Sequence, residues 1–304
     1  MFLLFLSRLL FKIMKIYNSK EWLHSVLNFP KTDTFIKLLP YIILMSIYSL
    51  AIAYLELEYL KLNQRSWLKE ITTVHSLLGF VISMLLVFRT NSAYDRWWEG
   101  RKQWGTLTNV SRSFAMKLNG ILAEDDFENR DFFNRSITLF SKALFSFLRS
   151  DYSTFMLDEI KYDEMDLQSK HAPNQVARLM YQRLIKLQIE GKISGDQLIV
   201  IDKEFSEFNN VCGACERIKN TPIPYSYSSF IKKFIVFYVV TLPIGLVFSM
   251  GYFVGLAVPF IFYVLGSLEL IAESIEEPFG TDTDDLPIEQ ITKNIEKHVG
   301  EILM

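Results

Sequence analysis

Four stretches of this sequence are apolar and close to or at the length that crosses a lipid bilayer. They are Leu38–Leu57, Ile71–Phe88, Phe234–Met250 and Tyr252–Leu268. A transmembrane helix needs about 20 predominantly apolar residues. No alternating strand pattern with turn signals accompanies them. We therefore expect an all-α membrane protein with four transmembrane helices in each subunit.

The second apolar stretch turns abruptly polar at Arg89. Residues 89–105 read RTNSAYDRWWEGRKQWG, with charges of both signs, three tryptophans and a tyrosine. Tryptophan, tyrosine and snorkelling arginine side chains settle at the headgroup level of a membrane. This junction is where we expect the membrane to end and a water-facing domain to begin.

Four spans place both termini and the long middle region on the same side of the membrane. Basic residues flank the second and third spans on that side. By the positive-inside rule, the termini and the middle region are therefore expected to be cytoplasmic, with the spans in the cell (inner) membrane. The asymmetry is moderate, because the loop after the first span also carries basic residues. The flanking residues are Arg89, Arg96, Arg101, Lys102, Lys232 and Lys233, and the loop carries Lys61, Arg65 and Lys69.

The alternation of apolar and polar segments suggests a division of the chain. Residues 1–30 contain MFLLFLSRLLFKIMKIY, which we interpret as an interfacial amphipathic segment rather than a signal peptide, with Met14 as an alternative start. The next boundaries are 31–90 for two spans, 91–229 for a cytoplasmic helical domain, 230–270 for two spans and 271–304 for a cytoplasmic tail with an acidic turn and a helix.

The middle region has helical periodicity. Apolar residues recur at helical spacing in two series, and Gly191 and Gly195 bracket a predicted turn between helices. Pro222 and Pro224 are expected to end this region. Net charge is −2 with no long basic run, which argues against nucleic acid as a partner.

One stripe on the second span allows two interpretations. Phe80, Met84 and Phe88 lie four residues apart and share a helix face. The stripe is either ordinary lipid-facing or core surface, or a hydrophobic constriction of a pore. Since one chain with four spans can hardly surround a pore with this helix alone, the pore interpretation implies a cyclic homo-oligomer.

A second candidate feature is acidic. Glu269, Glu273 and Glu276 share one helix face just past the fourth span. They form either a solvated helix end or an acidic pore lining that raises the local cation concentration. We expect no carboxylate inside the membrane with a basic partner.

Metal, cofactor and enzyme chemistry are not predicted. Asp282, Asp284 and Asp285 follow a glycine but lack the spacing of an EF-hand, so a capped turn is favoured and calcium at Asp282 and Asp285 is a minor alternative. Cys212 and Cys215 have metal-ligand spacing without a second Cys or His pair in sequence. The sequence contains no catalytic triad order, phosphate loop or zinc-protease motif.

Three motifs in order resemble the bestrophin family on its prokaryotic branch. They are FRTNSAYDRWWEGRKQWG after a glycine-containing apolar helix, CERIKNTPIPYSYS before the third span, and EEPFGTDTDDLP after the fourth. The resemblance implies a homopentameric passive ion channel with one axial pore and no cofactor. It selects the pore interpretation, with Phe80, Met84 and Phe88 as the neck, and places the cytosolic aperture near Asp196.

The resemblance leaves the permeant ion open. Animal members resemble chloride channels, whereas prokaryotic members look cation-selective, and the acidic residues here agree with the second, so we expect monovalent cations. A chloride channel of the same architecture is the alternative. The calcium clasp of animal members is matched only at Asp282 and Asp285, with Thr283 interrupting the run, so calcium activation is not expected.

Other classes of protein remain open at this point. The C-terminal acidic cluster could serve a membrane-bound metal-binding protein or enzyme, and the cytoplasmic helices could form a scaffold for another protein. For the channel, the expected partners are further copies of the chain, the lipid bilayer and monovalent ions.

Overall fold

The computed structural model describes residues 33–62, 71–149 and 171–304, and these residues contain helices and no strand. The predicted interfacial segment at residues 1–30 lies outside them. The α-helices are α3 (Asp33–Tyr54), α4 (Ile71–Ile121), α5 (Phe127–Arg149), α6 (Ala172–Ile189), α7 (Gly195–Asn220), α8 (Tyr225–Met250), α9 (Val254–Glu276) and α10 (Ile288–Leu303). A π-helical turn, η3 (Leu55–Tyr59), and a 3₁₀ turn, η5 (Gly251–Phe253), complete the order.

The chain forms two compact units. Of the described residues, one unit contains 33–62, 71–95 and 223–276, and the other contains 96–149, 171–222 and 277–304. Helix α4 is a single 51-residue helix that contributes to both units. The change from apolar to polar sequence at Arg89, where a domain boundary is expected at residue 90, therefore lies inside a continuous helix.

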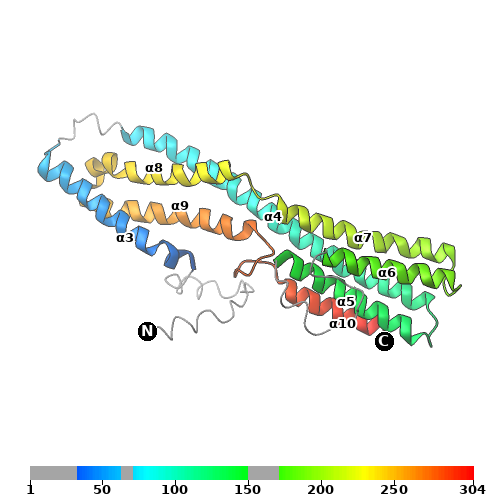
Figure 1. The fold of residues 1–304 in the computed structure, drawn as a ribbon. Helices are drawn as coiled ribbons and strands as arrows, with labels where there is room; N and C mark the ends of the chain where they lie inside the picture. The colour runs from blue at the N-terminus through cyan, green and yellow to red at the C-terminus, as the bar shows by residue number, and fades with distance from the viewer. Residues whose placement is uncertain (1–32, 63–70, 150–170) are drawn as a thin grey trace, which may run out of the picture. The chain divides into compact units, whose positions relative to one another are not determined.

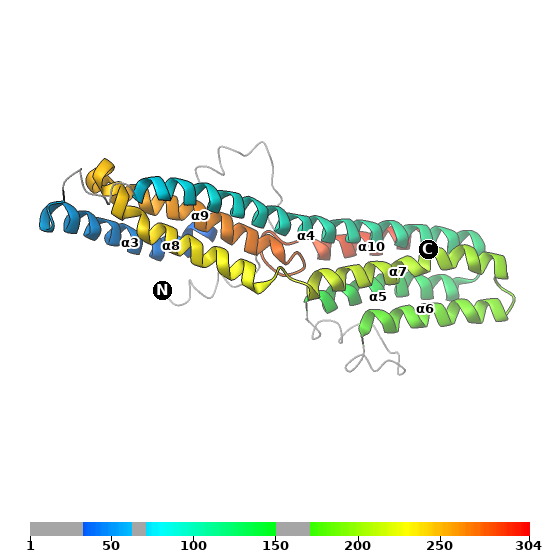
Figure 2. The same ribbon diagram turned by 90° about the horizontal axis from the view of Figure 1, so that it is seen from above.

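The first unit carries the apolar helices. Within the part of the chain that the structure describes, three helical stretches are long and apolar enough to cross a membrane, namely Thr34–Tyr59, Ile71–Ile121 and Tyr225–Glu276. The third contains both α8 and α9, which lie side by side in Figures 1 and 2. Gly251, at a φ of 55°, connects α8 to η5 in the left-handed region that favours glycine. That stretch is consistent with two spans, and the count of four stays a prediction.

Small residues allow the helices of this unit to approach closely. A Cβ atom added at Gly255 on α9 would lie 2.5 Å from the side chain of Leu50 on α3, and Ser46 donates a hydrogen bond to the Gly255 carbonyl at 2.7 Å. A Cβ added at Gly79 on α4 would lie 2.9 Å from the Tyr238 hydroxyl on α8. Close backbone approach at small residues is typical of helix packing in lipid.

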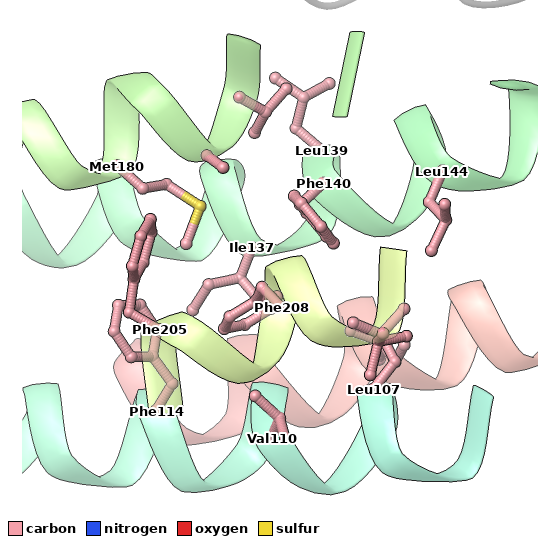
Figure 3. Packing of buried hydrophobic residues seen from close by; sticks show 14 of the residues in the cluster. Leu107, Val110, Phe114, Ile137, Leu139, Phe140, Leu144, Met180, Phe205 and Phe208 are labelled. Atoms are coloured by element: carbon pink, nitrogen blue, oxygen red, sulfur yellow. The ribbon is translucent and has the colours of Figure 1, made fainter. Parts of the chain in front are cut away.

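The second unit is a helical bundle with an aromatic core. The ring of Phe208 on α7 contacts Phe114 on α4 and Phe140 on α5 at centroid distances of 5.5 and 5.1 Å, both edge to face. Ile137 and Met180 belong to the same buried cluster and are drawn with these rings in Figure 3. Helix α10 packs its apolar face on α5. The core is thus assembled from segments far apart in sequence.

The turn between α6 and α7 matches the prediction from Gly191 and Gly195. Gly191 has a φ of 74°, and Gly195 is the first residue of α7. Ser194 and Gln197 form a capping box in which each side chain bonds the backbone N–H of the other residue. The break between α7 and α8 contains Pro222 and Pro224, as expected.

Candidate functional site

A buried ion-pair cluster lies where the apolar part of α4 ends. Arg89 is 1% exposed, and its Nη2 atom donates to Glu276 Oε2 on α9 at 2.7 Å. Its Nε atom lies 3.5 Å from Glu269 Oε2, whose side chain is 5% exposed. The other Glu276 oxygen accepts the backbone N–H of Ile223, ahead of α8, at 2.8 Å. One arginine therefore joins α4 to both ends of the α8–α9 hairpin.

From the sequence, no carboxylate inside the membrane is expected to have a basic partner, whereas Glu269 and Glu276 are predicted just past the fourth span, so this cluster does not test that expectation. The sequence alone predicts Arg89 only as a residue that snorkels to the headgroups. Arg89 follows the buried residues Ile82 and Leu86 at spacings of seven and three, so it lies on the same face of α4 as they do. A charged residue that continues the buried face of a helix needs a partner on a neighbouring element.

The predicted acidic row is divided by the fold. Glu269 and Glu276 face Arg89 within one subunit, and Glu273 pairs with Lys232 on α8 at 2.9 Å with both side chains about half exposed. A single subunit does not test a pore lining. Its contacts nevertheless assign Glu269 and Glu276 to an internal ion pair and leave Glu273 as the member most available to solvent.

The aromatic and methionine stripe lies on a different side of α4 from Arg89. Phe80, Met84 and Phe88 are 69%, 51% and 55% exposed, so they are not part of the core of the described subunit. At 3.6 residues per turn, Arg89 is turned by about 180° from Phe80. The buried face of α4 packs within its unit, and the stripe is left for lipid or for another subunit.

Asp196 lies in the first turn of α7, between the two capping-box residues Ser194 and Gln197, and is exposed. Its position follows from the Gly191–Gly195 turn that the sequence predicts. No described contact engages its carboxylate in an ion pair, and an aperture at this point stays a prediction.

The acidic turn before α10 is closed by its own residues. Asp285 is 3% exposed and accepts the backbone N–H of Asp282, while Trp97 on α4 donates to the Asp284 carbonyl at 2.9 Å. Burial raises the pKa of the Asp285 carboxyl to about 6, although the hydrogen bond from the Asp282 N–H lowers it in part. These contacts favour a capped turn over calcium binding at Asp282 and Asp285.

Arg96 has a role that sequence reasoning missed. Its guanidinium donates to the carbonyls of Ile218, at 2.6 Å, and of Thr221. The last carbonyl groups of a helix have no partner inside the helix, so a basic side chain from elsewhere can satisfy them. Arg96 thus fastens α4 to the end of α7.

Long apolar helices, a charged junction and a separate helical bundle define an all-helical membrane protein. A family model for bacterial and fungal bestrophins matches residues 14–301. This chain belongs to the bestrophin family, whose members are channels rather than enzymes.

Two curated relatives carry the name voltage-dependent anion channel-forming protein. The one from Ralstonia nicotianae is 32% identical over 240 residues, which cover 76% of this chain and 77% of the relative. The relative YneE from Salmonella typhi is 32% identical over 225 residues, which cover 73% of each chain.

Solved structures agree with this assignment. The chain is similar to a bacterial bestrophin homologue from Klebsiella pneumoniae, with a TM-score of 0.78 and 28% identity over 88% of this chain and 98% of that one. A second crystal structure, described as that of a membrane protein, gives a TM-score of 0.79 and 27% identity, over 88% of this chain and 98% of that one.

Proposed function

We propose that this protein is a passive ion channel in which α4 lines the pore. The observation that carries the proposal is the exposed stripe of Phe80, Met84 and Phe88, on the face of α4 that its own subunit leaves uncovered. The names of the curated relatives, which describe channel-forming proteins, support the same class.

The pore requires several copies of the chain. One exposed face of one helix cannot enclose a passage, whereas a closed ring of identical subunits can. We propose a homopentamer with both termini cytoplasmic and with α3, α4, α8 and α9 spanning the inner membrane. Rings of bulky apolar side chains at one level form a constriction that gates by losing its water.

The conducted ion is proposed to be an anion, which departs from the cation expectation. The relatives are named for anion channels. The cation argument also loses support, because Glu269 and Glu276 share Arg89 and Glu273 has Lys232 within ion-pair distance. Asp196, with its exposed carboxylate, is the remaining feature in favour of cations.

Planar bilayers containing the purified chain in asymmetric KCl test conduction and selectivity together. An anion channel gives a reversal potential displaced toward the chloride equilibrium potential, and a cation channel gives the opposite sign. Current that is absent at every voltage, or a particle of one 35.5 kDa chain by native mass spectrometry in mild detergent, would contradict the proposal.

The neck is tested by replacing Phe80, Met84 and Phe88 together with Ala. Removing three bulky side chains per subunit widens a hydrophobic constriction, so open probability should rise. Leu256→Ala with Phe260→Ala is the matched control, since both side chains are exposed and four residues apart on α9, a helix that the proposal does not place at the pore axis. Equal currents from the triple variant and the control would remove the neck from the proposal.

A further inference from the structure

Three metal-ligating side chains meet at the start of α6. The Nε2 atom of His171 is in direct contact with Glu216 Oε1, and Cys212 Sγ lies 3.3 Å from the same oxygen. The three ligand atoms all lie within 4.8 Å of one another. Among the residues that the structure describes, no other three His, Cys, Asp or Glu side chains converge in this way.

The helices place these groups with little freedom. Cys212 and Glu216 are four residues apart on α7 and so share one face. His171 is the N-cap residue of α6, where its ring packs on Phe147 of α5 at a centroid distance of 4.3 Å. Cys212 is 2% exposed, whereas the side chains of His171 and Glu216 are 25% and 30% exposed. The cluster is thus walled on the protein side and open to solvent on the other.

We propose that His171, Cys212 and Glu216 bind one Zn²⁺ ion, which ties the start of α6 to α7. Imidazole, thiolate and carboxylate are the three ligand types that zinc accepts in proteins. Zinc bonds of about 2.0–2.3 Å in a tetrahedral site place neighbouring ligand atoms about 3.3–3.8 Å apart, which small side-chain movements achieve here. The thiolate and the carboxylate balance the charge of the ion, and water completes the fourth position from the open side.

Binding changes the protons of the cluster in a defined way. In the free protein Cys212 donates to Glu216, because burial and that carboxylate raise the pKa of the thiol. Zinc displaces this proton, which is released to solvent. His171 Nδ1 accepts the Asn174 backbone N–H at a long 3.3 Å in the free protein. Coordination of zinc through Nε2 requires the ring proton to be on Nδ1. Nδ1 can then no longer accept the Asn174 N–H, so this weak helix-capping hydrogen bond is lost and the metal bond replaces it.

The proposal departs from the sequence expectation of no metal. In sequence, Cys212 and Cys215 form a pair with metal-ligand spacing but with no further ligands after it. In the fold, Cys215 is fully buried in the core and lies outside the cluster, and the second and third ligands are Glu216 and His171. The proposal is independent of ion conduction.

Zinc content of the full-length chain in detergent is the test. Protein stripped with a chelator and dialysed against Zn²⁺ should retain one ion per chain. With Co²⁺ as the probe, a near-ultraviolet thiolate-to-metal charge-transfer band should appear and should disappear when Zn²⁺ is added. His171→Ala, on a partly exposed residue, should weaken Zn²⁺ binding by more than about 100-fold, since even outer-shell changes cost 10- to 100-fold.

Two controls separate this site from adventitious binding. Cys215→Ser removes the other buried thiol of α7, and His298→Ala removes the exposed histidine paired with Glu301 at 3.2 Å. Both should retain the ion and the cobalt band, whereas Cys212→Ser should lose the band. No bound metal in the wild type, or binding that survives His171→Ala, would overturn the proposal. If Cys212→Ser fails to fold, the wild-type cobalt band and His171→Ala still decide it.

Discussion

Removing the charge of Arg89 should destabilise the apolar unit far more than removing an exposed charge beside it. In Arg89→Met the side chain keeps much of its length but loses the guanidinium. Glu276 retains the Ile223 N–H, while Glu269, 4% exposed, loses its only described basic contact within 4 Å. The variant therefore leaves a carboxylate buried without compensation.

The expected cost follows from that burial. Breaking a buried ion pair from one side costs about 3–5 kcal/mol of unfolding free energy, because the remaining charge is left desolvated. The control is Lys232→Met, which breaks the 2.9 Å pair with Glu273, whose side chains are 47% and 51% exposed. Exposed pairs contribute up to about 1 kcal/mol. Adding Glu269→Gln to Arg89→Met removes the stranded charge and should recover a large part of the loss.

The assay is thermal unfolding of the full-length chain in one detergent at fixed protein concentration. For a chain of this length, 1 kcal/mol corresponds to roughly 2 °C in the unfolding midpoint. Arg89→Met should lower the midpoint by about 6–10 °C and Lys232→Met by no more than about 2 °C. Equal shifts in the two variants, or no recovery with Glu269→Gln, would refute the assignment of a buried, mutually dependent cluster.

Three further predictions use the same assay. Gly255→Ala should lower stability by about 1–3 kcal/mol, because its Cβ would lie 2.5 Å from the Leu50 side chain; a midpoint equal to wild type would show that α3 and α9 do not pack so closely. Phe208→Ala should lower the unfolding free energy by about 3–5 kcal/mol, because it leaves a cavity in the aromatic core. A variant that is only mildly destabilised would contradict this prediction. The pKa of Asp285 is about 6 in the folded chain against an ordinary 3.8, so folding favours the protonated carboxyl. The stability that this protonated group contributes is present at low pH and is lost as the pH rises to 6 and above. Asp285→Asn should abolish this dependence when unfolding midpoints at pH 4 and pH 7 are compared.

Local patterns predicted the helices well. The sequence predicts an acidic turn and then a helix within residues 271–304, and α10 (Ile288–Leu303) is that helix, with buried residues at helical spacing after Pro287. The third and fourth apolar stretches are predicted to end at Met250 and to begin at Tyr252, and Gly251 between them has the positive φ that a sharp turn requires. In both places the determinants lie within a few residues of the element that they specify.

Contacts between distant segments could not be predicted in this way. Arg89 and Glu276 are 187 residues apart, and no local pattern states that they pair. The cluster of His171 with Cys212 depends equally on how α6 packs against α7. For each site the sequence shows only one of the partners. For the ion-pair cluster it shows Arg89 on a buried helical face, and for the proposed metal site it shows Cys212 without a recognisable second ligand.

The ion pair and the stripe are linked through the rotation of α4. Apolar residues surround much of this helix near its polar junction, so packing of Ile82 and Leu86 alone specifies its rotation weakly. Arg89 adds a directional constraint, because a shift of one residue turns the helix by about 100° and carries the guanidinium away from both carboxylates. Since Phe80 lies half a turn from Arg89, fixing the one on the buried side fixes the other on the exposed side. An ion-pair cluster that contributes little net free energy compared with apolar replacement of all its members can therefore determine which side chains of α4 its own unit leaves exposed.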